Sequence, residues 1–207
     1  MKKKIKYVLL GSLALLLIFM GYFGYQKSLV LKQVYQYEPI VREELAKYQL
    51  TEYTDTILAI IMTESKGIGN DPMQSFESMN TEVGSFDDSK QSIQQGVKHF
   101  VDLYRYNQKK KCDYATMIQA YNFGLDYIDY VAEHGKKHSL DLAEQYSKQK
   151  LAPALGNTSL KRYRYFHIVS IWHNGGYLYR NGGNFYYATL VKMNHFQLYW
   201  YKKIMNG

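Results

Sequence analysis

A run of 19 residues without a charge, from Tyr7 to Tyr25, constrains this chain more than any other feature. A helix needs about 20 apolar residues to cross the hydrocarbon core of a bilayer, so the run is just long enough. Four lysines precede it, and the positive-inside rule keeps them on the cytoplasmic side. Tyr22, Phe23 and Tyr25 then lie at the outer interface as an aromatic belt. The sequence therefore predicts one membrane-spanning helix in the cell membrane, with the rest of the chain outside the cytoplasm.

A cleaved signal peptide is the alternative for this segment, and it would release the same domain outside the cell. Its cleavage site requires small residues, but Tyr22 and Tyr25 occupy the critical positions near Gly24 and Ser28. A lipoprotein anchor needs a cysteine directly after the apolar run, and the only cysteine, Cys112, lies far beyond it. A lipoprotein anchor is therefore excluded. We therefore expect an uncleaved anchor.

The net charge of +8 is unevenly distributed along the chain. Residues 1–27 carry +5, residues 28–135 carry −6 and residues 136–207 carry +9. The first group sets membrane topology, and the last can attract an anionic polymer such as a cell wall. An external location argues against nucleic acid as the partner, and the sequence contains no recognised DNA-binding motif.

The remainder of the sequence predicts a mainly helical domain without a sheet core. Thr54 is a suitable N-cap, with Asp55 in the first turn of a helix that ends near Gly67 and Gly69. Four glycines in residues 173–184 predict a turn or a short hairpin. The other predicted helices cover residues 29–50, 89–107, 112–121, 125–133, 139–151 and 185–204.

Glu64 is the candidate catalytic residue of the helix that starts at Thr54. It follows Ile57, Ile60 and Ile61 at spacings of seven, four and three residues, which place its carboxylate on the apolar face. Desolvation on such a face favours the neutral acid, which is the form that a glycosidase uses as general acid. An exposed, idle glutamate at a frayed helix end is the alternative from spacing alone.

The residues around Glu64 form a long motif. From Glu64 to Ser78 the sequence is Glu-Ser-Lys-Gly-Ile-Gly-Asn-Asp-Pro-Met-Gln-Ser-Phe-Glu-Ser, and Ala-Tyr-Asn follows at 120–122. This pattern resembles the superfamily of goose-type lysozymes and soluble lytic transglycosylases. It is most similar to the lysozyme-like domain of bacterial bifunctional cell-wall hydrolases and of streptococcal surface proteins. The stretch 174–187 is also similar to the tail of that family.

The resemblance implies a mainly α, lysozyme-like fold and hydrolysis of the β-1,4 bond between N-acetylmuramic acid and N-acetylglucosamine in peptidoglycan. Glu64 matches the catalytic acid. Asp71 matches a second acid, which either positions a water across the cleft or braces the loop. Gln74 and Ser75 are as well suited to capping a turn as to binding sugars, whereas a tyrosine such as Tyr121 is more often a core residue on sequence alone. The substrate-binding candidates are Ser65, Gln74, Ser75, Tyr121, Asn122 and Tyr186. Tyr186 and Tyr187, just before the last predicted helix, are the two aromatic residues that we expect to reach the cleft.

We therefore divide the chain into three parts: a basic stub with the anchor (1–27), a helical stalk (28–50) and a lysozyme-like catalytic domain (51–207). No cofactor is expected. No metal is expected either, because His134 and His138 lack the HExxH pattern of a zinc site. The alternatives to a muramidase are a lytic transglycosylase that uses the same acid, and a non-catalytic wall-binding surface protein.

Overall fold

The structure is a computed structural model that describes residues 2–75 and 88–205. Glu77 and Ser78, which complete the motif, lie outside the described residues. The elements in chain order are α1 (Lys2–Tyr35), α2 (Glu38–Ala46), α3 (Thr54–Glu64), α4 (Asp88–Lys110), α5 (Tyr114–Phe123), α6 (Asp126–Glu133), α7 (Leu140–Tyr146), α8 (Ala152–Ala154), β1 (Arg162–Arg164), α9 (Ile168–Asn174), β2 (Tyr177–Tyr179) and α10 (Tyr187–Met205).

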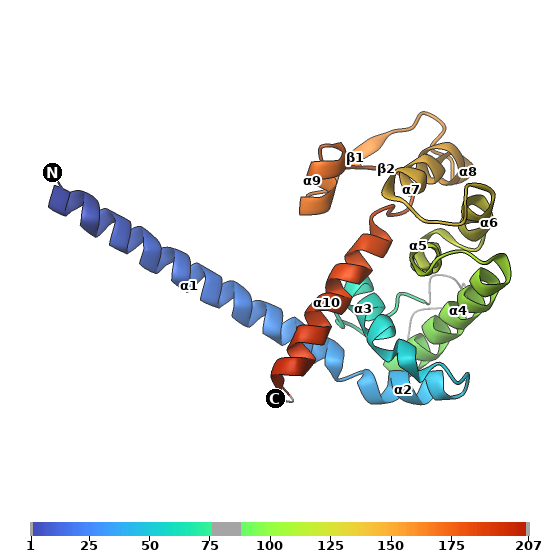
Figure 1. The fold of residues 1–207 in the computed structure, drawn as a ribbon, viewed down its shortest axis with the longest axis horizontal. Coiled ribbons are helices and arrows are strands. Elements are labelled where there is room, and N and C mark those ends of the chain that lie inside the picture. The colour runs from blue at the N-terminus through green and yellow to red at the C-terminus, as the bar shows by residue number, and fades with distance from the viewer. Residues whose placement is uncertain (1, 76–87, 206–207) are drawn as a thin grey trace.

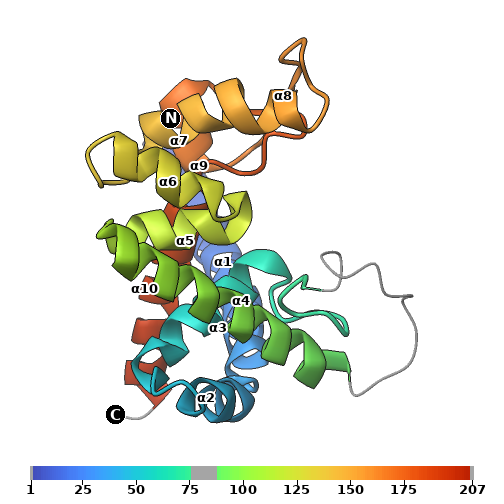
Figure 2. The same cartoon turned by 90° about the vertical axis from the view of Figure 1, so that its right-hand side faces the viewer.

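Helix α1 projects from a domain of shorter helices (Figure 1). Within the domain, α2, α3 and α4 lie at one end and α7, α8 and α9 at the other, with α5 and α6 between them (Figure 2). Helix α10 runs along α3 and has its most extensive helix–helix contact with it. The architecture is mainly α, as the sequence predicted.

Helix α1 is continuous over 34 residues, and its side chains from Leu9 to Leu29 are exposed. By length and composition it is the one helix among the described residues that can cross a membrane. Its other end enters the domain, where Val34 is fully buried. The prediction of one helix over 29–50 is wrong, because α1 ends at Tyr35 and α2 begins at Glu38. Pro39 in the first turn of α2 lacks an N–H and cannot continue the preceding helix.

Helix α3 is the centre of the domain. Its residues from Ile57 to Ile61 are all fully buried, as expected of a helix that is apolar on every side. The prediction that Thr54 caps this helix is wrong, since Tyr53 occupies the cap position. A 3₁₀ turn over Thr51–Tyr53 runs directly into α3, so the Thr54 hydroxyl donates backward to the Thr51 carbonyl at 2.6 Å.

The predicted helices after α4 shift by a few residues because side-chain caps decide where they begin. Asp113 caps α5 by accepting from the Thr116 amide at 3.1 Å, and Ser139 caps α7 in the same way. The predicted helix over 139–151 is α7 followed by a π-helical turn, Ser147–Leu151.

A small antiparallel sheet pairs Arg162 with Tyr179 and Arg164 with Tyr177. Strand β2 lies within the segment for which a turn or hairpin was predicted. Its partner β1 comes earlier in the chain, and a helix lies between the two strands. That helix, α9, was not predicted. Its seven residues are too few for periodicity to reveal, and its N-cap is His167, whose ring accepts from the Val169 amide.

Alkaline unfolding tests the burial of aromatic side chains in this core. Burial raises the pKa of Tyr53 and of Tyr146 to about 12, from an ordinary value of 10. A folded-state pKa above the unfolded one gives stability that is fully present below pH 10 and is lost as the pH rises toward 12. We expect two phases of phenolate absorbance, the second coinciding with loss of helical circular dichroism. A single phase near pH 10 with intact helicity would contradict this burial.

Candidate active site

Glu64 is the last residue of α3, and it is half-buried where the helix leaves the core. The buried turns before it hold the backbone in place, so the position of the carboxylate is set by packing. Its Oε1 accepts a hydrogen bond from the Tyr187 hydroxyl at 2.5 Å. This contact joins two residues that are 123 positions apart in the chain.

Tyr187 is the first residue of α10 and is only 2% exposed. Its burial and the charge of Glu64 hold the pKa of its hydroxyl well above 10. The hydroxyl therefore keeps its proton at neutral pH and donates to the carboxylate. Hydrogen bonds to a charged group are stronger than neutral ones, so this contact fixes the rotamer of Glu64.

Tyr121 stacks on Tyr187 with ring centroids 6.1 Å apart and an interplanar angle of 6°. Burial raises the pKa of Tyr121, and the charges of Glu64 and Asp71 raise it further. Both carboxylates are thus within electrostatic range of one tyrosine hydroxyl. The structure brings together Glu64, Asp71 and Tyr121, three of the residues that the sequence nominated.

The start of α10 is held by a buried amide that the sequence analysis missed. Gln119 is fully buried, its Nε2 donates to the Asn184 carbonyl at 2.9 Å and its Oε1 accepts from the Ala188 amide at 3.1 Å. Asn122 fixes the same turn, since its Oδ1 accepts from the Asn184 amide at 2.7 Å. These bonds set the register at which Tyr187 meets Glu64. The available signal was a glutamine among apolar residues in the predicted helix.

The loop after α3 is closed by Ser65 and Gln74. The Ser65 hydroxyl donates to the Pro72 carbonyl at 2.8 Å and accepts from the Gly67 amide at 3.0 Å. Gln74 donates through Nε2 to the backbone carbonyl of Glu64 at 2.9 Å. Both candidate substrate-binding residues therefore hold the loop against the end of α3.

Asp71 braces the same loop against α4. Its Oδ1 accepts from the Ser92 hydroxyl at 2.5 Å, from the Ser75 amide at 2.9 Å and from the Ser75 hydroxyl at 3.4 Å. Ser92 is fully buried and also accepts from the Met73 amide at 3.0 Å. Asp71 and Ser75 thus form one hydrogen-bonded unit, and bracing is a role that the geometry shows directly.

Tyr186 points into the domain, where it is fully buried and its ring stacks on Tyr165 at 5.9 Å. Its hydroxyl has no hydrogen-bond partner among the described residues. Tyr187, the next residue, is the one that contacts Glu64. The two adjacent tyrosine side chains therefore make different contacts. Asn184 fixes the turn that carries them, because its side chain accepts from the Tyr186 amide at 3.0 Å.

The base of α1 supports the loop that follows Glu64. Gln33 donates through Nε2 to the Gly67 carbonyl at 2.8 Å, and the Tyr37 hydroxyl donates to the same atom at 3.3 Å. Gly67 has a positive φ of 74°, and an added side chain would lie 3.3 Å from the Tyr37 ring. Only glycine satisfies both conditions without strain. The end of α1 therefore packs directly against the candidate active site.

The site is built from carboxylates, hydroxyls and amides. Within residues 2–75 and 88–205 no three His, Cys, Asp or Glu side chains converge in a way that could hold a metal ion. His138 contacts the Tyr127 hydroxyl at 2.8 Å, and His134 contacts the Tyr130 carbonyl at 2.6 Å. The chemistry available to these residues is proton transfer and hydrogen bonding.

Comparison with known proteins identifies the family of the chain. Residues 31–195 match the lysozyme-like family. Pneumococcal vaccine antigen A of Streptococcus pneumoniae serotype 4 is 44% identical over 94% of this chain and 93% of its own length. The bifunctional muramidase/DL-endopeptidase CwlT of Bacillus subtilis is 31% identical over 60% of this chain and 37% of its own length.

One solved structure has a similar fold. A Staphylococcus aureus protein described as similar to a lipoprotein of the NLP/P60 family matches with a TM-score of 0.69 and 34% identity. The match covers 79% of this chain and 52% of that one, so this chain spans about half the length of the solved protein.

The adjacent tyrosines provide a matched pair of variants that tests the site geometry. Tyr187→Phe removes a hydrogen bond to a charged group and should lower the free energy of unfolding by about 1.5–3 kcal/mol. Tyr186→Phe removes a buried hydroxyl without a partner, so it should leave stability unchanged or raise it. Urea unfolding of the full chain in detergent measures both. Equal losses in the two variants would contradict the assignment.

Proposed function

The chain belongs to the lysozyme-like family, and we propose that it is a peptidoglycan hydrolase with Glu64 as its general acid. The observation that carries this proposal is the placement of Glu64 at the emerging end of a buried helix, held by the Tyr187 hydroxyl. A general acid must be fixed within hydrogen-bond reach of the leaving oxygen, and this arrangement fixes it.

We propose that the bond cleaved is the β-1,4 linkage between N-acetylmuramic acid and N-acetylglucosamine. Glu64 would donate its proton to the glycosidic oxygen as the bond breaks. The resulting carboxylate is then stabilised by the Tyr187 hydroxyl, which needs no rearrangement to do so. Muramidase activity, named for CwlT, supports this choice of bond.

Asp71 is the proposed second acid. Its charge and that of Glu64 both act on Tyr121, which supports a shared site. In the hydrolase its carboxylate would orient a water toward the sugar from the other side. Asn122 and Tyr121 are proposed to hold an N-acetyl group, because a carboxamide can both donate and accept. Ser65, Gln74 and Ser75 are proposed to shape the sugar site through the backbone they hold. Tyr186 is proposed to do so through the packing of its buried ring.

A lytic transglycosylase is the second candidate, and one observation favours it. Asp71 Oδ1 accepts from three donors in the loop, as expected of a brace. In a transglycosylase the 6-hydroxyl of the muramic acid attacks in place of water, so one acid is sufficient. The two reactions give different products, a reducing end or an anhydro end.

We also propose a location and a division of the chain. Residues 1–27 would anchor the protein in the cell membrane as a single pass, residues 28–50 would lead into the domain, and residues 51–207 would carry the activity outside the cytoplasm. The exposed apolar side chains of α1 support an anchor. The charge of +9 in residues 136–207 would hold the enzyme on an anionic wall, with an attraction that weakens in salt.

Glu64→Gln tests the catalytic assignment. The amide keeps the size of the side chain but cannot donate a carboxylic proton, so release of muropeptides from peptidoglycan should fall by about 10²-fold or more. The control is Glu52→Gln, an exposed glutamate before α3, which should leave release unchanged. Mass spectrometry of the products separates the reactions: reducing ends support the muramidase, and anhydro ends support the transglycosylase. Wild-type release by Glu64→Gln would refute both.

Asp71→Asn separates charge from bracing. The amide oxygen can still accept from Ser75 and Ser92, so the loop should stay in place and the unfolding temperature should not change. For the hydrolase, activity should nevertheless fall by about 10²-fold, because the carboxylate is lost. Ser92→Ala is the counterpart, since it removes the brace and keeps the charge. Full activity in Asp71→Asn would assign Asp71 to bracing alone.

A further inference from the structure

Helix α9 exposes an apolar face that the proposed catalysis does not use. Phe166 is 81% exposed, Ile168 58%, Ile171 51% and Trp172 83%. Ile168, Ile171 and Trp172 are spaced i, i+3 and i+4, so they lie on one side of the helix. We call these four residues the α9 face. Large apolar side chains grouped in this way on a surface mark a contact with another phase or molecule.

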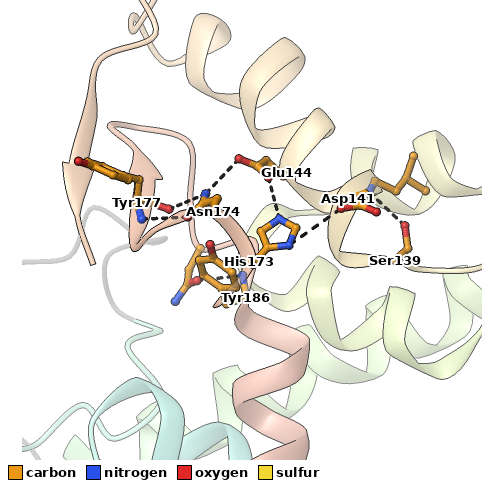
Figure 3. Close-up of polar contacts among 9 residues, drawn as sticks. Ser139, Asp141, Glu144, His173, Asn174, Tyr177 and Tyr186 are labelled. Carbon is orange, nitrogen blue, oxygen red and sulfur yellow. Dashed lines mark hydrogen bonds and ion pairs between the residues drawn. The ribbon is translucent and has the colours of Figure 1, made fainter. Parts of the chain in front are cut away.

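The α9 face is held in place from behind, so its exposure is not a sign of loose packing. His173 contacts Glu144 of α7 at 2.7 Å, and Asn174 donates to the other oxygen of Glu144 at 3.1 Å (Figure 3). Ser170 is fully buried and donates to the Tyr165 carbonyl at 2.5 Å. These polar contacts lie on the domain side of α9, and they fix its orientation.

The position of α9 relative to α1 indicates what covers this face. Helix α9 lies on the side of the domain from which α1 projects, whereas α8 lies on the opposite side (Figure 1). His167, the N-cap of α9, lines a pocket of about 360 Å³ together with Phe23 and Lys27 of α1. Phe23 belongs to the last turns of the apolar run. The start of α9 is therefore level with the outer end of the membrane-spanning segment.

The charge around this pocket is positive. Lys66, from the loop after α3, lines it together with Lys27. Burial and the charge of Lys27 lower the pKa of His167, so the positive charge at this pocket is carried by the two lysines. Lysines at the end of a membrane helix attract anionic lipid head groups.

We propose that the α9 face lies in the outer lipid layer of the membrane that α1 spans, with Lys27 and Lys66 facing anionic phospholipid head groups. The proposal rests on the membrane anchor of the proposed function. A short helix with aromatic and aliphatic residues on one face and fixed polar contacts on the other is typical of interfacial binding. Tryptophan favours this depth because its ring is amphipathic. The domain would then be held at two points, α1 and α9.

Tryptophan fluorescence tests the proposal directly, since the chain has only Trp172 and Trp200. Full-length Trp200→Phe is reconstituted into phosphatidylcholine–phosphatidylglycerol vesicles with or without bromine on the acyl chains. We expect brominated lipid to quench roughly half or more of the Trp172 emission, and aqueous iodide to quench little. Glu64→Gln in the same background should show the same quenching, so a loss of catalysis leaves this readout intact.

Variants of the face supply the matched comparison. Ile168→Ser with Ile171→Ser should reduce lipid quenching and increase iodide quenching of Trp172. Leu155→Ser, at a residue beside α8 that is 59% exposed, should change neither. The proposal is overturned if the protein floats with the vesicles but Trp172 is quenched only by iodide. It is also overturned if Trp172 is shielded only at high protein density, which indicates a second copy, or only after addition of glycan strands, which indicates a sugar site.

Discussion

The burial of α3 determines where the candidate active site can be. Its residues from Ile57 to Ile61 are fully buried among α1, α2 and α10, so the helix has no freedom to rotate or shift. Glu64 is the residue at which this buried helix reaches the edge of the core. The loop that follows must then turn at once, and Ser65, Gln74 and Asp71 hold it there through hydrogen bonds to α3 and α4. The Glu64 carboxylate has a defined position because the helix that carries it is buried and packed on every side.

The sequence could nominate Glu64, but it could not give the contact that Glu64 makes with α10, and the reasons are physical. Glu64 could be found because a 3.6-residue period places it on the face of Ile60 and Ile61, and because a local motif surrounds it. Tyr187 could not be placed, since its contact with Glu64 depends on the register of α10 more than 100 residues away. That register is set by Gln119 and Asn122, which bond to the turn before α10, and tertiary contacts of this kind leave no periodic signal. For the same reason the sequence could not decide which of Tyr186 and Tyr187, both expected at the cleft, contacts Glu64.

The fold was predictable to a similar extent. The lysozyme-like class followed from the motif, and most helices followed from the spacing of apolar residues. The errors concern where helices begin and end, and each has a local cause. Pro39 ends the helix predicted over 29–50, and a 3₁₀ turn moves the N-cap of α3 away from Thr54. Helix α9 was missed because it is too short to show a period. The apolar residues Ile168, Ile171 and Trp172 of α9 also face outward, so the helix lacks the buried apolar face by which a short helix of a domain is normally detected.

The contact between α1 and Gly67 fixes the distance between the apolar run and the loop that follows Glu64. Val34 packs against Gly67 and is nine residues beyond Tyr25, the end of the apolar run. If α1 spans the membrane as proposed, the rise of an α-helix would place the loop after Glu64 about 14 Å above the hydrocarbon edge. No hinge separates the two, because α1 is continuous between them. With the proposed activity, an enzyme tethered in this way would have a fixed and short reach. Its substrates would then be the glycan strands next to the membrane.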